Sequence, residues 1–141
     1  MAQSSGKCLC GKVTFTAEGV ERHCHACHCG MCRRWSGGAP FFGVGVKQVT
    51  FHGSEHVARY ASSEWAERGF CTSCGTSLFY FLKAEQLYTL GAGTFDEPSQ
   101  FSLAREIFID HKPPGYELAG DHPRLTEAEA FAADGDPDPR Q

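Results

Sequence analysis

Cysteine spacing constrains the fold of this 141-residue chain more than any other feature of its sequence. Seven of the eight cysteines fall into three short groups: Cys8-Leu9-Cys10-Gly11, Cys27-His28-Cys29-Gly30-Met31-Cys32 and Cys71-Thr72-Ser73-Cys74-Gly75. Thiolates one or two residues apart on a tight turn can bind one ion, and a glycine after the second cysteine supplies the positive φ that such a turn needs. The spacing therefore predicts zinc sites.

The groups differ in the number of ligands that they offer. A Cys-x-Cys pair and a Cys-x-x-Cys pair together supply the four soft ligands of a closed tetrahedral site. The run from Cys27 to Cys32 supplies only three thiols, so a zinc bound there either keeps an open position or takes a ligand from a neighbouring residue. An open position is where chemistry can occur.

A disulfide framework is the ordinary alternative for so many cysteines. The segment Met1–Lys7 is polar and is followed by no apolar stretch of the kind found in signal peptides, so the chain is expected to be cytoplasmic, where thiols stay reduced. Cysteines this close in sequence also cannot form disulfides with each other without strain. Metal ligation is therefore favoured over disulfides.

Length and charge exclude several classes of protein. A chain of 141 residues with 41% hydrophobic and 12% aromatic residues can bury one core, so residues 1–133 are predicted to form a single zinc-binding domain. The formal net charge of −4 argues against general nucleic-acid binding, and no apolar run approaches the length of a membrane span.

The periodicity of the sequence is mostly that of strands. Short alternating runs predict strands at 12–16, 42–46, 47–51, 58–60, 77–82, 87–90 and 106–110. No long helical stripe separates them, which favours an all-β fold of small, mainly antiparallel sheets with the cysteine groups at turns. Near the C-terminus, Thr126 to Glu129 is a capping-box pattern that predicts a short helix to about Ala133, followed by a flexible tail at 134–141.

Five segments, in their order and spacing, carry a more specific signal than any single Cys-x-x-Cys. They are Gly6–Val13, Cys27–Gly37, Arg68–Thr76, Gly93–Pro98 and Ile107–Pro114. Together they resemble the glutathione-dependent formaldehyde-activating enzyme family, which includes the centromere-protein-V-like proteins. The resemblance extends from Gly6 to Arg124.

This resemblance implies a β-tent fold that holds two zinc ions. It implies a structural zinc bound by Cys8, Cys10, Cys71 and Cys74, and a zinc assigned to catalysis bound by Cys27, Cys29 and Cys32. It also implies a reaction that joins glutathione to formaldehyde as S-hydroxymethylglutathione, which is a carbon–sulfur lyase reaction written in reverse.

The sequence departs from the family at two positions. Gly115 stands where the family commonly has a tryptophan, which removes a large flat side chain from that place. Cys24 lies three residues before Cys27 and is outside the usual ligand set, but its spacing would allow it to close the second site. The other nearby candidates for a fourth ligand are His23, His25 and His28; because His28 stands between two ligands, we expect its side chain to face away from their metal.

A zinc held by three thiolates suits the activation of an incoming thiol better than that of water. Arg33 and Arg34 follow the last cysteine directly. Their guanidinium groups are predicted to bind substrate, since they pair well with the carboxylates of glutathione, although solvated surface arginines are the ordinary alternative.

The leading hypothesis is therefore a zinc-dependent carbon–sulfur lyase-type enzyme that acts on a small-molecule thiol such as glutathione. The second is a non-catalytic, zinc-stabilised binding module, which a closed second site would favour. Thiol redox chemistry is a weaker third, because Cys24 alone is left over once the metal ligands are assigned.

Overall fold

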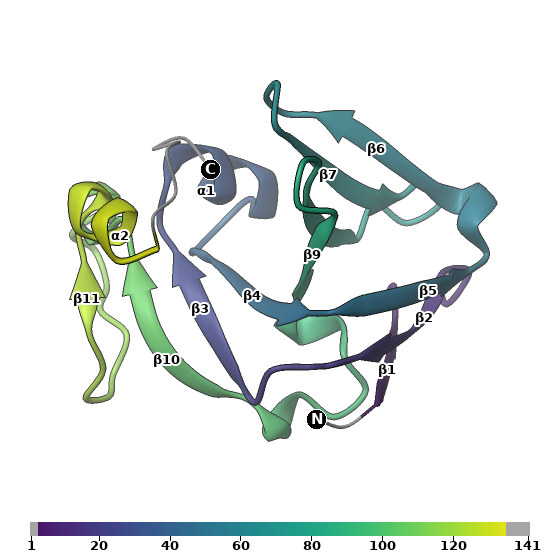
Figure 1. Ribbon diagram of the computed structural model, residues 1–141, viewed down its shortest axis with the longest axis horizontal. Helices are drawn as coiled ribbons and strands as arrows, with labels where there is room; N and C mark the ends of the chain where they lie inside the picture. Colours follow the sequence, from purple (N-terminus) through teal and green to yellow (C-terminus); the bar gives the residue numbers. More distant parts are fainter. Residues whose placement is uncertain (1–2, 135–141) are drawn as a thin grey trace. The chain divides into compact units, whose positions relative to one another are not determined.

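The computed structural model describes residues 3–134 of the chain (Figure 1). Within them the backbone forms small sheets and two short α-helices. The strands are β1 (Ser4–Lys7), β2 (Thr14–Glu18), β3 (His23–Cys27), β4 (Phe41–Val46), β5 (Gln48–His52), β6 (Val57–Ala61), β7 (Ala66–Cys71), β8 (Ser77–Leu82), β9 (Leu87–Gly91), β10 (Ser102–Ile107) and β11 (Arg124–Leu125). The helices are α1 (Gly30–Ser36) and α2 (Glu127–Asp134).

The described backbone divides into two compact units. The first unit contains residues 3–23 and 43–102, and the second contains residues 24–42 and 103–134. The four cysteines of the outer pairs belong to the first unit, and the run from Cys27 to Cys32 belongs to the second. The single domain expected over 1–133 stays a prediction.

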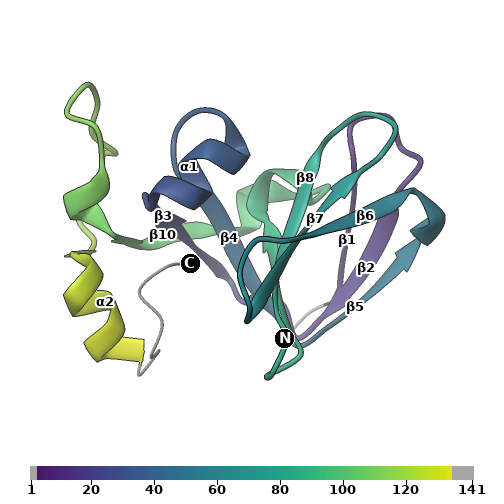
Figure 2. The same cartoon turned by 90° about the horizontal axis from the view of Figure 1, so that it is seen from above.

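Two sets of strands build the first unit. One set is an antiparallel sheet in the order β1-β2-β5, whose strands lie side by side in Figure 2. In the other set β4, β9, β8, β7 and β6 pair antiparallel in that order. Phe51 on β5 packs against Phe79 on β8, with 5.2 Å between the ring centroids, and Phe15 on β2 packs edge-on against Phe51. These rings form the aromatic core of the unit.

The second unit contains the strands β11, β10 and β3, which are neighbours in that order, and β10 and β11 are parallel. Its apolar core consists of Phe41, Ile107, Phe108 and Ala130, packed together with the cysteines of the middle group. The ligand-bearing segment is therefore part of a core.

The predicted fold class, mainly antiparallel β with small sheets and a short C-terminal helix, is confirmed. The capping box is present: the Thr126 N–H donates to Glu129 Oε1 at 2.8 Å, and the Glu129 N–H donates to Thr126 Oγ1 at 3.2 Å. Residues 135–141 of the predicted tail lie outside the described residues. In the described part of the chain, neither helix is long and apolar enough to cross a membrane.

Several local predictions were wrong or incomplete. The strand predicted at 106–110 ends at Ile107, because Phe108 takes a left-handed conformation with φ of 59° and Ile109–His111 form a 3-10 turn. Helix α1 was not predicted, since its seven residues are too few to show a helical stripe. Strands β1, β3, β7 and β11 were also missed. In β1 and β7 the alternation of polar and apolar residues is weak, β11 has only two residues, and the alternating residues of β3 were considered only as candidate ligands.

Candidate metal centres

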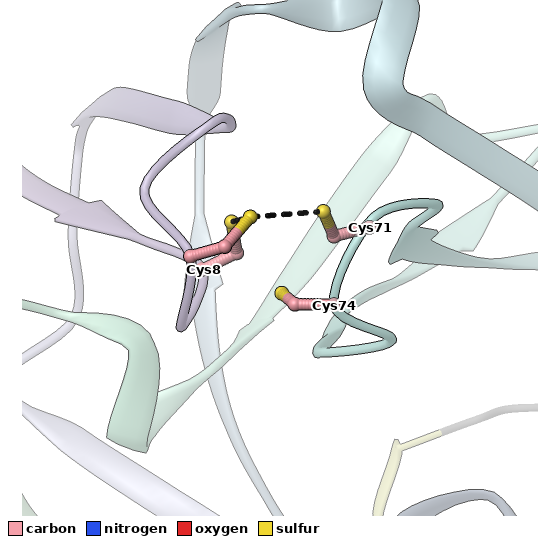
Figure 3. A group of neighbouring side chains, drawn as sticks. Cys8, Cys71 and Cys74 are labelled. Carbon is pink, nitrogen blue, oxygen red and sulfur yellow. Dashed lines mark hydrogen bonds between the residues drawn. The ribbon is translucent and has the colours of Figure 1, made fainter.

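The two outer cysteine pairs meet at one place in the first unit. Cys8 and Cys10 lie in the loop after β1, and Cys71 and Cys74 lie at the end of β7 and in the turn that follows. All four sulfur atoms lie within 4.8 Å of one another. Figure 3 shows Cys8, Cys71 and Cys74 turned toward a common point from two loops.

The sulfur positions fit a tetrahedral zinc ion. The Sγ atoms of Cys8 and Cys10 are 3.6 Å apart, and those of Cys10 and Cys71 are 3.8 Å apart. Zinc–sulfur bonds of about 2.3 Å in a regular tetrahedron place the sulfurs about 3.8 Å apart. The observed spacing is therefore that of ligands around one ion.

Tight turns bring these sulfurs together. Gly11 and Gly75, one residue after each pair, both have φ of +79°, as the sequence predicted. The N–H of Gly11 donates to the Cys8 carbonyl and that of Gly75 to the Cys71 carbonyl, which closes each turn. The two loops are tied by the Leu9 N–H, which donates to Thr76 Oγ1 at 3.0 Å.

The four thiols have unequal acidities on their own. The Thr76 hydroxyl, 3.1 Å from Cys74 Sγ, lowers the pKa of Cys74 to about 5. The Lys12 backbone lowers the pKa of Cys10, but burial and the neighbouring thiols Cys8 and Cys74 outweigh this effect and raise it to about 11. A divalent cation would favour the thiolate form of all four, which is the form that binds metal.

The middle group is buried inside the second unit. Cys27 ends β3, Cys29 caps the N-terminus of α1, and Cys32 lies in the first turn of α1. Their sulfurs also lie within 4.8 Å of one another, and the side chains are 7%, 4% and 3% exposed. Hydrogen bonds with Cys29 and Cys32, together with burial, raise the pKa of Cys27 well above its ordinary value.

Gly30 behaves differently from the other two glycines. It begins α1 and has no positive φ, so the expected turn after Cys29 is replaced by the first turn of a helix. The Cys32 N–H donates to Cys29 Sγ at 3.3 Å, which orients that sulfur. The three cysteines are thus arranged by a strand end and a helix start, where the sequence predicted a hairpin turn.

Among the described residues, no fourth cysteine, histidine or carboxylate joins this group within the same 4.8 Å. Cys24 is buried on β3, but it lies three positions before Cys27, and side chains an odd number of positions apart point to opposite faces of a strand. His25 Nδ1 accepts a hydrogen bond from Arg105, and His23 pairs with Glu21. His28 is not part of the group; it is buried, and its Nε2 lies 2.7 Å from Glu106 Oε1.

The two arginines after the cysteines differ in position. Arg33 is half-buried in α1, whereas Arg34 is exposed. Gly115, at the position of the family's tryptophan, is exposed, and a Cβ atom there would meet nothing within 4 Å. The fold therefore has room for a larger side chain at residue 115.

A buried carboxylate that the sequence did not reveal lies next to the three-cysteine segment. Glu106 is 1% exposed. Its Oε1 accepts from His28 Nε2 at 2.7 Å and its Oε2 accepts from His122 Nε2 at 2.6 Å. Oε2 also forms an ion pair with Arg124, whose Nε lies 3.0 Å away. Burial raises the pKa of Glu106, but the hydrogen bonds from His122 and His28 outweigh it and lower the pKa overall. The carboxylate is therefore ionised.

Comparison with known proteins identifies the family. The model of the glutathione-dependent formaldehyde-activating enzyme family matches residues 3–111. The chain belongs to this family. An uncharacterized lyase of Schizosaccharomyces pombe is 32% identical over 133 residues, which cover 93% of this chain and 96% of the relative.

A solved structure supports the fold independently. The crystal structure of a Rhodobacter sphaeroides protein matches with a TM-score of 0.57 at 18% identity, covering 85% of this chain and 98% of the other. At that identity the likeness shows the fold alone. Family membership and the lyase-named relative together support a glutathione-related, lyase-type function, and the cysteine groups could hold metal ions.

Proposed function

We propose that this chain is a zinc-dependent carbon–sulfur lyase-type enzyme that forms S-hydroxymethylglutathione from glutathione and formaldehyde, or handles a related thiol adduct. The observation that carries the proposal is the difference between the two cysteine groups. Cys8, Cys10, Cys71 and Cys74 supply a full tetrahedral set, while Cys27, Cys29 and Cys32 supply one ligand fewer. A structural zinc at the first group and a catalytic zinc at the second follow from that difference.

The donor sets support zinc as the metal. Both consist of cysteine sulfur alone, which suits zinc far better than magnesium or calcium. A zinc ion held by Cys27, Cys29 and Cys32 would favour the thiolate form of an incoming thiol near neutral pH. The free thiols of all eight cysteines also fit the reducing cytoplasm in which we expect the protein to act.

The proposed reaction needs no oxidant or reductant. The thiolate sulfur attacks the carbonyl carbon of formaldehyde, a carbon–sulfur bond forms, and the π electron pair moves to the oxygen. That oxygen takes up a proton, which balances the proton lost by the thiol. The chain's part would be to bind and orient glutathione, and the positions of Arg33 and Arg34 directly after Cys32 support this role for them.

Burial of the three sulfurs favours the alternative, a non-catalytic zinc-stabilised binding module. None of Cys27, Cys29 and Cys32 is more than 7% exposed, so a substrate has little access to them in this conformation. The two functions make different predictions for turnover.

The test is the rate at which glutathione exchanges with ¹³C-formaldehyde, measured by NMR magnetisation transfer on zinc-loaded protein. We expect wild-type protein to accelerate the exchange and Cys29→Ser to lose the acceleration while keeping one zinc and a native circular dichroism spectrum. Cys24→Ser is the matched control, since it removes a buried thiol from the opposite face of β3. Equal exchange in wild-type protein and Cys29→Ser would refute the enzyme and leave the binding module.

A further inference from the structure

The two cysteine turns of the first unit share one internal arrangement. In each turn the first cysteine is buried, with Cys8 1% and Cys71 0% exposed. The second cysteine of each turn precedes the glycine with positive φ and lies nearer the surface, since Cys10 is exposed and Cys74 is half-buried. The first metal group therefore has a buried pair, Cys8 and Cys71, and a solvent-side pair, Cys10 and Cys74, with one member of each pair in each loop.

The surroundings leave the solvent-side pair open to small solutes. Leu9, directly before Cys10, is 86% exposed, and the residues on either side of Cys74 are exposed as well. By contrast, the three cysteines of the second metal group are buried in an apolar core, and none is more than 7% exposed. A small oxidant in solution therefore meets the first group before the second.

The solvent-side pair is also close enough to form a disulfide. All four sulfurs of the group lie within 4.8 Å of one another, and a sulfur–sulfur bond is about 2.05 Å long, so a modest approach is enough. Cys71 is the less suitable partner for Cys10, because its backbone is held in β7 by pairing with Val57 and by the N–H that it donates to the Thr76 carbonyl. Cys74 lies in the turn beyond the strand and is less constrained.

We propose that Cys10 and Cys74 form a reversible oxidation site for hydrogen peroxide and other small hydroperoxides. Their conversion to a disulfide leaves only Cys8 and Cys71 as ligands of the first metal group, so a zinc ion bound there is released. The inference rests on the structural zinc of the proposed function, and it adds a redox-sensitive step outside the proposed reaction.

The chemistry balances with peroxide as the oxidant. The Cys10 thiolate attacks one peroxide oxygen, the oxygen–oxygen bond breaks, and hydroxide leaves, which gives a sulfenic acid. The Cys74 thiolate then attacks the sulfenic sulfur, a sulfur–sulfur bond forms, and the oxygen leaves as a second hydroxide. The two sulfurs together lose two electrons to the peroxide, and both hydroxides take up a proton to become water.

The disulfide would connect the same two loops that the metal connects. The Leu9 N–H, which donates to Thr76 Oγ1, also ties these loops together, so we expect the oxidised protein to remain folded without this zinc ion. Exchange with two molecules of reduced glutathione returns both thiols and gives oxidised glutathione. The thiol substrate of the proposed reaction would therefore also restore the metal site.

The test adds hydrogen peroxide stepwise to the zinc-loaded full chain in the absence of free thiols. A chromogenic zinc indicator follows the released metal, and tandem mass spectrometry after alkylation of the remaining thiols locates the oxidised residues. We expect one zinc ion released per peroxide consumed, a disulfide between Cys10 and Cys74, and full alkylation of the second group. The circular dichroism spectrum should stay native, and reduced glutathione with added zinc should restore the original zinc content.

The matched control is Cys24→Ser, which removes the one cysteine outside both groups. It should release the same amount of zinc at the same peroxide concentration as wild-type protein. If its zinc were retained, the oxidation would depend on Cys24, and the assignment to the solvent-side pair would be wrong.

The outcomes also separate this inference from the proposed function. Oxidation of the second group before the first, a disulfide that contains Cys8 or Cys71, or zinc retained by the first group under peroxide would each overturn the oxidation site and leave the structural zinc in place. Equal zinc contents of untreated wild-type protein and Cys71→Ser would instead show that the first group binds no zinc. That result would overturn the structural zinc itself, and this inference with it.

Discussion

His28 and Glu106 are 78 residues apart in sequence, yet their side chains are joined by a 2.7 Å hydrogen bond and both are 1% exposed. His28 stands between two of the cysteines that we assign to the second metal. The orientation of that segment thus depends on a carboxylate that is remote in sequence.

Replacing Glu106 with glutamine should destabilise the protein in a pH-dependent way. The pKa of Glu106 is lower in the folded protein than in an unfolded chain, so its carboxylate stabilises the fold above the ordinary glutamate pKa, and this contribution is lost as the pH falls through the folded value. Urea unfolding of zinc-loaded wild-type protein and Glu106→Gln should differ by about 1–3 kcal/mol near neutral pH. The difference should shrink below about pH 4.

Two features make this comparison specific. Zinc content measured at each pH defines the range in which both proteins keep their metal, and the two are compared within that range. Glu85→Gln is the matched control, because Glu85 is exposed. A difference that stayed constant from neutral to acid pH would show that the charge of Glu106 does not contribute.

Cys71→Ser should lose one zinc ion and much of the fold of the first unit. Cys71 is fully buried, and its sulfur helps to join the loops after β1 and β7, so the serine variant loses a ligand and opens that connection. Metal analysis and thermal unfolding followed by circular dichroism measure both effects. The control is Cys24→Ser, which removes a buried thiol outside both groups and should keep both zinc ions. A Cys71→Ser protein with full zinc content and an unchanged melting temperature would rule out the structural zinc.

The two zinc ions should leave at different rates. A site with four protein ligands releases its metal more slowly than a site with three. A strong chelator should therefore first remove the zinc bound by Cys27, Cys29 and Cys32 and leave a folded protein with one equivalent. Chromogenic zinc detection alongside circular dichroism follows the process, and a single phase in which both ions leave as the protein unfolds would contradict the division into two kinds of site.

Arg33→Gln should weaken glutathione binding more than Arg34→Gln. Arg33 is half-buried in α1, while Arg34 is exposed, where a charge pair is screened by water. Titration calorimetry of both variants with glutathione measures the difference. Equal affinities in the two variants would show that the partial burial of Arg33 has no part in recognition.

The cysteine groups could be predicted from the sequence because each is local. Two or three thiols within six residues must lie close together in any fold, and the glycines at 11 and 75 indicated the turns correctly. The pairing of the loop after β1 with the turn after β7 came from counting ligands and from the family resemblance. The four cysteines that were grouped from the sequence are therefore the four that lie together in the structure.

Glu106 and its partners could not be predicted in the same way. Its position in the run from Glu106 to Ile109 resembles the exposed end of an ordinary strand, and nothing local shows that it is buried. Its hydrogen-bond and ion-pair partners His28, His122 and Arg124 are far apart in the sequence. Tyr116, which contacts His28, lies in the loop between β10 and β11. The role of Cys24 was ambiguous because its exclusion from the second metal group depends on residues 23–27 forming a strand, which was not predicted.

The central claim is that one metal site is complete and the other has a position for a thiol. Substitution with ¹¹³Cd followed by NMR tests it directly, because cadmium bound by four sulfurs resonates downfield of cadmium bound by three sulfurs and a lighter ligand. The account predicts two signals, of which only the upfield one moves, downfield, when glutathione is added. Two four-sulfur signals before the addition, with neither shifting afterwards, would contradict it.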